Sequence, residues 1–442
     1  MVSRSKLFAL CVAVAAISCL PAARTAVAAD YYVDGKSGKD IAPGNATKPF
    51  ATIYRALSTA RPGDTIHMLP TMTYAGPLYI AANGTAAAPI TITGAGTGST
   101  MTKVVGQNNF AIDVAGTSSY VTVEGFNATA PGVYSAIFVS PGATHVTITG
   151  NTAHDSGGAG IGTSGSDYVT VSYNVVFGNA FDTSESCDSG ISLYQLRNSD
   201  GLKGTKNYVV GNVVYGNSNK PGGSCDDSDG NGIIIDDSRN TQNRSPYGPY
   251  VGTTLIANNV SYRNGGRGIH VFESDNVIIV NNTLYENNQD PYEGSWEPGE
   301  ITLVNSGSVE IVNNIAYSDG LVKSYFYHAG ISVQTCEGGP IIINNNLVYN
   351  GTNNMSFAFY LPTDAVHGNS NSISVGPWGS WNVWANPQFK NATGAGLAAN
   401  FEVLRGSRAL ALGNKSLTPT HDILGTPAPQ WPTVGAHETP AN

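Results

Sequence analysis

Residues 254–285, TLIANNVSYRNGGRGIHVFESDNVIIVNNTLY, decide the fold. This stretch contains twice a four-residue motif of asparagine, two mostly β-branched or small residues, and an aromatic, at Asn259–Tyr262 and at Asn282–Tyr285. The two copies start 23 residues apart, and the residues between them show no helical spacing of apolar side chains. A repeat of this length, built from short strands, indicates a solenoid of stacked β-coils.

The same motif recurs along most of the chain. It begins at Asn151, Asn174, Asn212, Asn259, Asn282, Asn314 and Asn346, and Gly/Ser/Pro-rich insertions lengthen some of the steps. A second strand in most coils starts with glycine followed by isoleucine, at Gly160, Gly190, Gly232, Gly268 and Gly330. Because stacked coils place like residues over like, we expect an internal asparagine ladder and an aromatic stack. The stack is expected to contain Phe177, Tyr215, Tyr262, Tyr285, Tyr317 and Tyr349.

Composition and charge limit the function classes. The chain has 442 residues, a net charge of −9, 12% charged and 41% hydrophobic residues, which argues against disorder and against a nucleic-acid partner. Residues 1–29 have a basic start, an apolar run and small residues at the end, the layout of a secretory signal peptide. A lipoprotein signal modified at Cys19 is the alternative. No later stretch is apolar enough to span a membrane, so we expect a secreted monomer, extracellular or periplasmic.

Three cysteines remain after the signal peptide: Cys187, Cys225 and Cys336. Cys187 and Cys225 lie in matching Ser-Cys-Asp contexts, and an exported protein can keep a disulfide bond. We predict that these two residues pair and that Cys336 is left over.

Negative charge is concentrated at residues 226–237, DDSDGNGIIIDD. Strand alternation puts Ile233 and Ile235 inward and Ile234 and Asp236 outward, with Asp237 at the strand end. Stacking the neighbouring coils predicts a wall with outward Tyr194, Asp236, His270 and Phe272, and with Asp188, Asp229, Asn231, Asp237, Arg267 and Glu273 at the strand ends. The coils on either side carry Gly162 and Ser164, or Thr302 and Val304, and show no comparable cluster.

Carboxylates on one wall repel each other unless they are solvated, share protons or bind a cation. Ca²⁺ takes carboxylate and amide oxygens as ligands, so we predict a calcium site at Asp188, Asp229, Asp236 and Asp237. A solvated acidic turn without metal is the alternative, because Asp, Ser, Gly and Asn are ordinary turn residues.

The repeat architecture resembles the right-handed parallel β-helix of the pectate-lyase-like superfamily. Residues 48–66 look like the N-terminal cap helix and first coil of such proteins, and residues 386–389 and 422–438 like their closing segment. The resemblance implies an all-β, right-handed parallel β-helix with a short cap helix. After the signal peptide at 1–29, we expect one domain at 30–442, with a cap and first coils at 30–100, central coils with the active face at 101–350, and C-terminal coils with the closing segment at 351–442.

Within this superfamily, the order of acidic residues is similar to that of the family-nine polysaccharide lyases. In that family aspartates on two coils hold Ca²⁺, and a lysine on the following coil is the base. Here the corresponding position is occupied by His270, or by Ile234 in the other possible register. The resemblance therefore implies the calcium site and leaves the base in question.

The chemistry of elimination suggests how the lysine could be replaced. Cleavage of a uronate by β-elimination needs a neutralised carboxylate and a base for the C5 proton. Ca²⁺ would neutralise the carboxylate, and His270, with an ordinary pKa near ~6.5, would be the base. Arg267 would steady the substrate carboxylate. We therefore expect a polysaccharide lyase that acts on a uronate-containing glycan.

Two other functions stay open. In a glycoside hydrolase, Asp236, Asp237 and Glu273 would supply the acid and base, or a nucleophile. In a non-catalytic carbohydrate-binding surface protein, the acidic cluster would bind only structural Ca²⁺.

The polar insertions beside this face suggest a groove for a glycan. Exposed aromatics suit stacking on sugar rings, and arginines suit an acidic sugar. The predicted substrate-binding residues are Tyr194, Gln195, Arg239, Arg244, Tyr247, Phe272 and Trp296.

Overall fold

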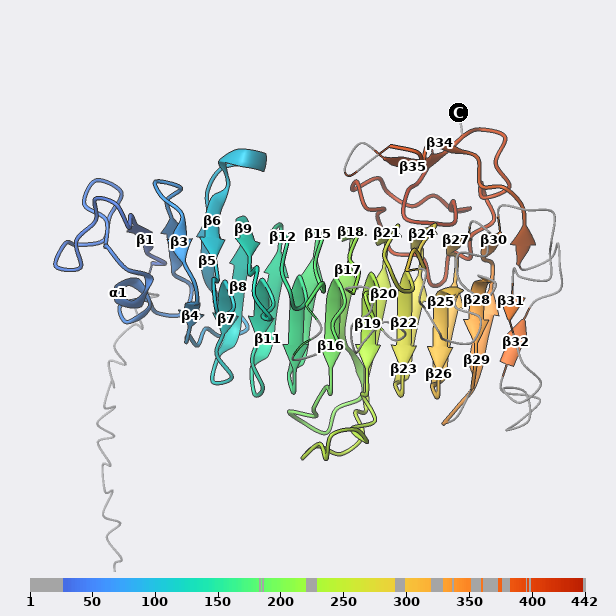
Figure 1. The fold of residues 1–442 in the computed structure, drawn as a ribbon, viewed down its shortest axis with the longest axis horizontal. Coiled ribbons are helices and arrows are strands. Elements are labelled where there is room, and N and C mark those ends of the chain that lie inside the picture. The colour runs from blue at the N-terminus through green and yellow to red at the C-terminus, as the bar shows by residue number, and fades with distance from the viewer. Residues whose placement is uncertain are drawn as a thin grey trace, which may run out of the picture.

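Three long parallel sheets form the body of the protein in the computed structural model (Figure 1). The structure describes residues 27–182, 184, 187–219, 229–290, 299–318, 329–335, 338–350, 359–360, 373–375, 382–394, 396 and 399–439. Most of the predicted signal peptide and Cys225, Cys336 and Trp296 lie outside these residues. No helix among them is long and apolar enough to cross a membrane.

Each sheet takes one strand from each successive coil. The first sheet contains β1 (Asp30–Val33), β2 (Thr65–Met68), β5 (Ile90–Gly94), β8 (Ser119–Glu124), β11 (Thr144–Thr149), β14 (Asp167–Ser172), β17 (Gly204–Val210), β20 (Gly252–Ala257), β23 (Asp275–Val280), β26 (Gly307–Val312), β29 (Ile341–Asn344) and β32 (Ile373–Val375). The second sheet contains β4 (Leu78–Ile80), β7 (Ile112–Val114), β10 (Ile137–Val139), β13 (Ile161–Ser164), β16 (Ile191–Tyr194), β19 (Ile233–Asp236), β22 (Ile269–Phe272), β25 (Gly299–Val304), β28 (Ala329–Val333) and β31 (Phe359–Tyr360). The third sheet contains β3 (Tyr74–Ala75), β6 (Thr102–Val105), β9 (Phe126–Thr129), β12 (Thr152–His154), β15 (Val175–Phe177), β18 (Val213–Tyr215), β21 (Val260–Tyr262), β24 (Thr283–Tyr285), β27 (Ile315–Tyr317), β30 (Leu347–Tyr349) and β33 (Val383–Trp384). This arrangement confirms the predicted all-β parallel solenoid.

A helix and a small extra sheet lie outside the three long sheets. The five-residue helix α1 (Ile53–Leu57) lies beside β1 and β4 at the N-terminal end (Figure 1). The hydroxyl of Thr52 accepts a hydrogen bond from the amide of Arg55, which caps the first turn of α1. A 3₁₀ turn occupies Gly98–Thr100, and β34 (Phe389–Asn391) pairs with β35 (Asn400–Val403) in an antiparallel sheet.

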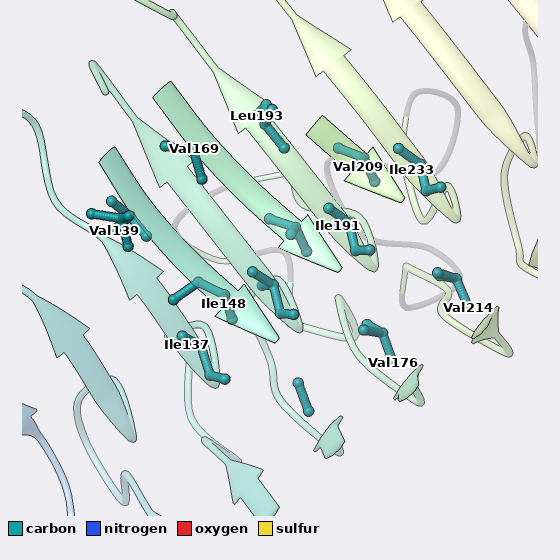
Figure 2. Close-up of a cluster of buried hydrophobic side chains, with 14 of the residues drawn as sticks. Ile137, Val139, Ile148, Val169, Val176, Ile191, Leu193, Val209, Val214 and Ile233 are labelled. Carbon is teal, nitrogen blue, oxygen red and sulfur yellow. The ribbon is translucent and has the colours of Figure 1, made fainter. Parts of the chain in front are cut away.

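The core consists of inward-facing aliphatic side chains contributed by all three sheets. Ile148 from the first sheet, Ile191 and Ile233 from the second and Val214 from the third are fully buried there (Figure 2). Each such side chain stabilises the fold by about 1.5–3 kcal/mol relative to an exposed position. The inward positions predicted for Ile233 and Ile235 are confirmed.

The predicted asparagine ladder is present and extends one coil further. Each side-chain amide donates to the Oδ1 of the asparagine on the next coil, at 2.9–3.1 Å. Its members are Asn151, Asn174, Asn212, Asn259, Asn282, Asn314, Asn346 and Asn382. The ladder satisfies buried backbone groups in the turns, which is why it can lie inside the protein.

A second ladder was not predicted. Asn179, Asn217, Asn264 and Asn287 are linked in the same way at 2.8–2.9 Å, and Asn287 also donates to the buried carboxylate of Glu300. Its members lie five residues after Asn174, Asn212, Asn259 and Asn282. This constant spacing in the sequence would have allowed the second ladder to be predicted.

The predicted aromatic stack forms on the third sheet in two parts. Phe177, Tyr215 and Tyr262 stack with ring centroids 5.0–5.1 Å apart, and Tyr317 packs between Tyr285 and Tyr349. Between the two parts, Phe401 of β35 contacts both Tyr262 and Tyr285, with ring centroids 5.1 and 5.4 Å away. The C-terminal segment therefore packs back onto the third sheet (Figure 1).

Candidate active site

One cavity of about 870 Å³ lies against the outward face of the second sheet. Strand register explains which side chains meet there. Tyr194, Asp236 and Phe272 are register partners on β16, β19 and β22, and Ile234 and His270 form the neighbouring row. The predicted site residues that line the cavity are Asp188, Tyr194, Asp229, Asp236, Arg267, His270 and Phe272.

Asp236 is a carboxyl in the cavity whose titration is strongly perturbed. Burial raises its pKa to about 8, and the charges of Asp229, Asp237 and Glu273 add to the increase. The amide of Gln242, 3.4 Å from Oδ1 of Asp236, opposes the shift. Because its pKa lies above neutrality, Asp236 carries a proton at pH 7 and is able to act as a general acid.

His270 lies at the base of the cavity and is only 4% exposed. Burial and the positive charge of Arg267 hold its pKa well below 6.5, so the ring is neutral at pH 7. Neither ring nitrogen has a hydrogen-bond partner. The expectation of an ordinary pKa for His270 is therefore wrong, because the ring is desolvated beside a cation.

Asn231 bonds both to Asp229 in its own coil and to the backbone of Arg267 in the next coil. The side-chain oxygen of Asn231 accepts from the backbone amide of Arg267 at 2.9 Å, and its side-chain amide donates to Asp229 at 3.2 Å. Ser189 also donates to Asp229, at 3.4 Å. Asn231 thus links the side chain of Asp229 to the backbone at Arg267.

The structure places Asp237 away from the cavity, contrary to the prediction that it is catalytic or a calcium ligand. Asp237 is fully buried, and its oxygens accept hydrogen bonds from Gln195, from the amide and hydroxyl of Thr241 and from the amide of Gln242. Its backbone has a φ of 45°, which turns the chain at the end of β19. The carboxylate therefore organises a turn, and its acceptor sites are occupied.

Residues 245–398 match the model of a family described as "right handed beta helix region". The chain is a right-handed parallel β-helix. None of the curated proteins matches its sequence.

The chain is also similar to several solved structures. The pectate lyase Pel9A is 16% identical, with 93% of this chain and 96% of that chain covered and a TM-score of 0.49. A rhamnogalacturonan lyase is 15% identical, with 72% and 87% covered and a TM-score of 0.38. The GH136 lacto-N-biosidase from Eubacterium ramulus is 15% identical, with 73% and 60% covered and a TM-score of 0.40. Similarity at this level shows nothing about the activity of this chain.

Two further predicted site residues of the β-helix lie beside the cavity without lining it. Glu273 accepts hydrogen bonds from the hydroxyl of Thr241 and the amide of Gln242, so it supports the loop after β19. Gln195 is buried and donates to Asp237 and to the carbonyl of Gln242. Both side chains thus hold the loop after β19, and the predictions that Glu273 is catalytic and that Gln195 binds substrate stay predictions.

The predicted arginine contacts with substrate are not supported either. Arg239 forms a two-point ion pair with Asp275, at 2.8 and 2.9 Å, outside the cavity. Arg244 is exposed on the loop and does not line the cavity. Tyr247 packs against Gly165 instead, and Trp296 is outside the described residues.

Sequence reasoning missed part of the cavity lining. Gln242 and Asn243 reach it from the loop after β19, where Asn243 donates to the hydroxyl of Tyr194 at 2.8 Å. The N-terminal end is lined by Phe110, Val133, Tyr134, Ser135, Phe138, Gly162 and Ser164. The coil of Gly162 and Ser164 carries no acidic cluster, as expected, but it does line part of the cavity.

The predicted metal ligands do not converge in the described part of the chain. No group of three or more His, Cys, Asp or Glu side chains there is arranged to hold a metal ion. Asp188, Asp229 and Asp236 line the cavity, whereas Asp237 is occupied by donors. The calcium site therefore stays a prediction.

Cys187, at the rim of the cavity, is disulfide-bonded. Its predicted partner Cys225 is outside the described residues. The Cys187–Cys225 pairing therefore stays a prediction.

Proposed function

We propose that this protein cleaves glycosidic bonds by acid–base catalysis, with Asp236 as the acid. One observation carries the proposal: a carboxyl with a pKa of about 8 lies in a cavity beside a charged second carboxylate, Asp229. A cavity of about 870 Å³ is large enough for a sugar ligand, and the rings of Tyr194 and Phe272 offer surfaces for sugar rings.

Hydrolysis is the reaction that this geometry favours. Asp236 would donate its proton to the glycosidic oxygen as the bond to the anomeric carbon breaks. Asp229 or Asp188 would then accept a proton from the attacking water, or attack the anomeric carbon itself. Negative charge on these two residues also stabilises the positive charge that develops on the sugar ring in the transition state.

Elimination on a uronate is the second candidate, and His270 is the observation that favours it. A neutral imidazole with two unpartnered nitrogens is able to accept the C5 proton. The C4–O bond would then break, and the leaving oxygen would take the proton of Asp236, while Arg267 binds the substrate carboxylate. The lowered pKa of His270 makes it a weak base, which places this reaction second.

Product analysis distinguishes the reactions. The mature protein is incubated with acidic and neutral polysaccharides, each with Ca²⁺ and with chelator. New reducing ends without ultraviolet absorbance, unaffected by chelator, support hydrolysis. Unsaturated, absorbing ends support elimination, and their loss with chelator would establish the predicted calcium requirement.

A non-catalytic carbohydrate-binding protein is the remaining alternative. Binding of a glycan that stays intact after prolonged incubation would contradict the proposed activity. A secreted location, a polysaccharide partner and a monomeric state belong to the same proposal.

A further inference from the structure

We propose that Phe138, with Phe110 and Tyr134, forms a subsite that binds the apolar face of a sugar ring at the N-terminal end of the cavity. The ligand is then an oligosaccharide that extends across several coils, and the bond cleaved lies at Asp236. The second statement rests on the proposed function, whereas the subsite itself does not.

The aromatic side chains form an ordered wall. The rings of Phe110 and Phe138 are parallel within 3°, with centroids 4.5 Å apart, and Tyr134 meets the edge of Phe110 at 5.2 Å. Phe110 thus covers one face of the Phe138 ring. All three residues line the cavity, and Tyr134 is 36% exposed. A preformed flat apolar wall loses little conformational entropy when a ligand stacks on it.

The strands next to these aromatic rings carry small residues at the position in register with Phe138. Phe138 on β10 is in register with Gly162 on β13, which is in register with Ser192 on β16. A side chain at position 162 would meet the Phe138 ring, because an ideal Cβ there lies 3.1 Å from Cδ2. The absence of that side chain lets the Phe138 ring lie close to the backbone of β13. On the next coil, the position in register is occupied by the larger side chain of Ile234 on β19.

The distance between Phe138 and Asp236 indicates the size of the ligand. Phe138 and Asp236 belong to strands three coils apart in the second sheet. At the usual spacing of neighbouring strands this is about 14 Å. A monosaccharide at Asp236 would not reach Phe138, whereas a chain of several sugars would contact both.

The experiment measures binding separately from cleavage. Asp236→Asn protein is titrated calorimetrically with two size series, galacturonan and xylan oligosaccharides from disaccharide to hexasaccharide. We expect affinity to rise with length in one series. Phe138→Ala should weaken binding of the longest members by about five- to tenfold, the scale of one aromatic contact, and leave the disaccharide unaffected.

Two further variants guard against simple misfolding. Gly162→Val keeps every aromatic ring in the sequence but displaces that of Phe138, because its side chain would meet the ring, and it should also weaken only the binding of long oligosaccharides. Tyr79→Ala removes an exposed ring two coils away on the same sheet, outside the cavity, and should change nothing.

Equal loss of affinity for short and long oligosaccharides in Phe138→Ala, or no effect in either Phe138→Ala or Gly162→Val, would overturn the subsite. Failure to bind any member of either series would overturn it as well. Length-dependent binding through Phe138 without cleavage by the unsubstituted protein would retain the subsite and reject the proposed activity.

Discussion

Tyr194 and Asp236 are register partners on the adjacent parallel strands β16 and β19. Backbone hydrogen bonds of the sheet therefore hold the acid and the ring beside it at a fixed spacing, without help from flexible loops. Ile233 and Ile235 of the same strand are buried in the core. The apolar strand thus anchors the outward carboxyl.

Replacement of Asp236 by Asn should abolish most of the cleavage, because an amide cannot donate the proton that leaves a carboxyl. We expect the rate to fall by about 100-fold or more, the usual contribution of a general acid. Initial rates on the glycan identified by product analysis measure the change. Asp113→Asn, an outward carboxyl on the same sheet but outside the cavity, is the matched control and should retain full activity.

The pH dependence of cleavage should have an alkaline limb set by Asp236. The protonated form is the active one, so the rate falls as the pH rises through about 8. A profile of kcat/KM against pH checks this. An unchanged rate well above that pH would show that Asp236 is not the acid.

Asp236 should also make the fold less stable as the pH rises. Its pKa is raised from 3.8 in the unfolded chain to about 8 in the folded protein. Between these values the native state binds more protons than the unfolded state, so the free energy of unfolding decreases with increasing pH. Asp236→Asn removes this contribution. Urea unfolding of both proteins across this range should therefore show the variant gaining stability relative to the parent as the pH increases.

Removal of one ladder asparagine should destabilise the protein strongly. Asn259 accepts from the backbone and side-chain amides of Asn212, and it donates to Asn282 and to the carbonyl of Val209. Asn259→Ala leaves these buried groups unsatisfied, at a cost of about 3 kcal/mol. Chemical unfolding measures the loss. The exposed Asn109→Ala should differ little from the parent protein, and a similar loss in both variants would contradict the role of the ladder.

Much of the fold could be predicted because stacking repeats the same physical environment in every coil. The Asn-x-x-aromatic motif predicted both the ladder and the stack, and alternation predicted that Asp236 faces outward. Asp237 could not be placed in this way, because it follows the strand where φ becomes positive and the two-residue period ends. The aromatic wall was missed because a search for charge passes over Phe138 and Gly162.

The difference between repeated and non-repeated contacts also explains the errors in the predicted site. Contacts that repeat from coil to coil are visible in the sequence. The loop after β19 does not repeat, and its residues Thr241 and Gln242 donate hydrogen bonds to Asp237 that the strand pattern does not predict. The pKa values of Asp236 and His270 depend on burial by several coils and loops at once. No local motif encodes that burial.

Phe401 and its neighbours connect coils that a simple stack would leave independent. In a one-dimensional repeat each coil contacts only the next, and the ends melt first. Here the hydroxyl of Tyr262 donates to the carbonyl of Gly396, 134 residues away, and the amide of Ala436 donates to Thr283. The C-terminal segment thus binds several coils to one another. The end of the solenoid should therefore unfold together with its middle in one cooperative transition.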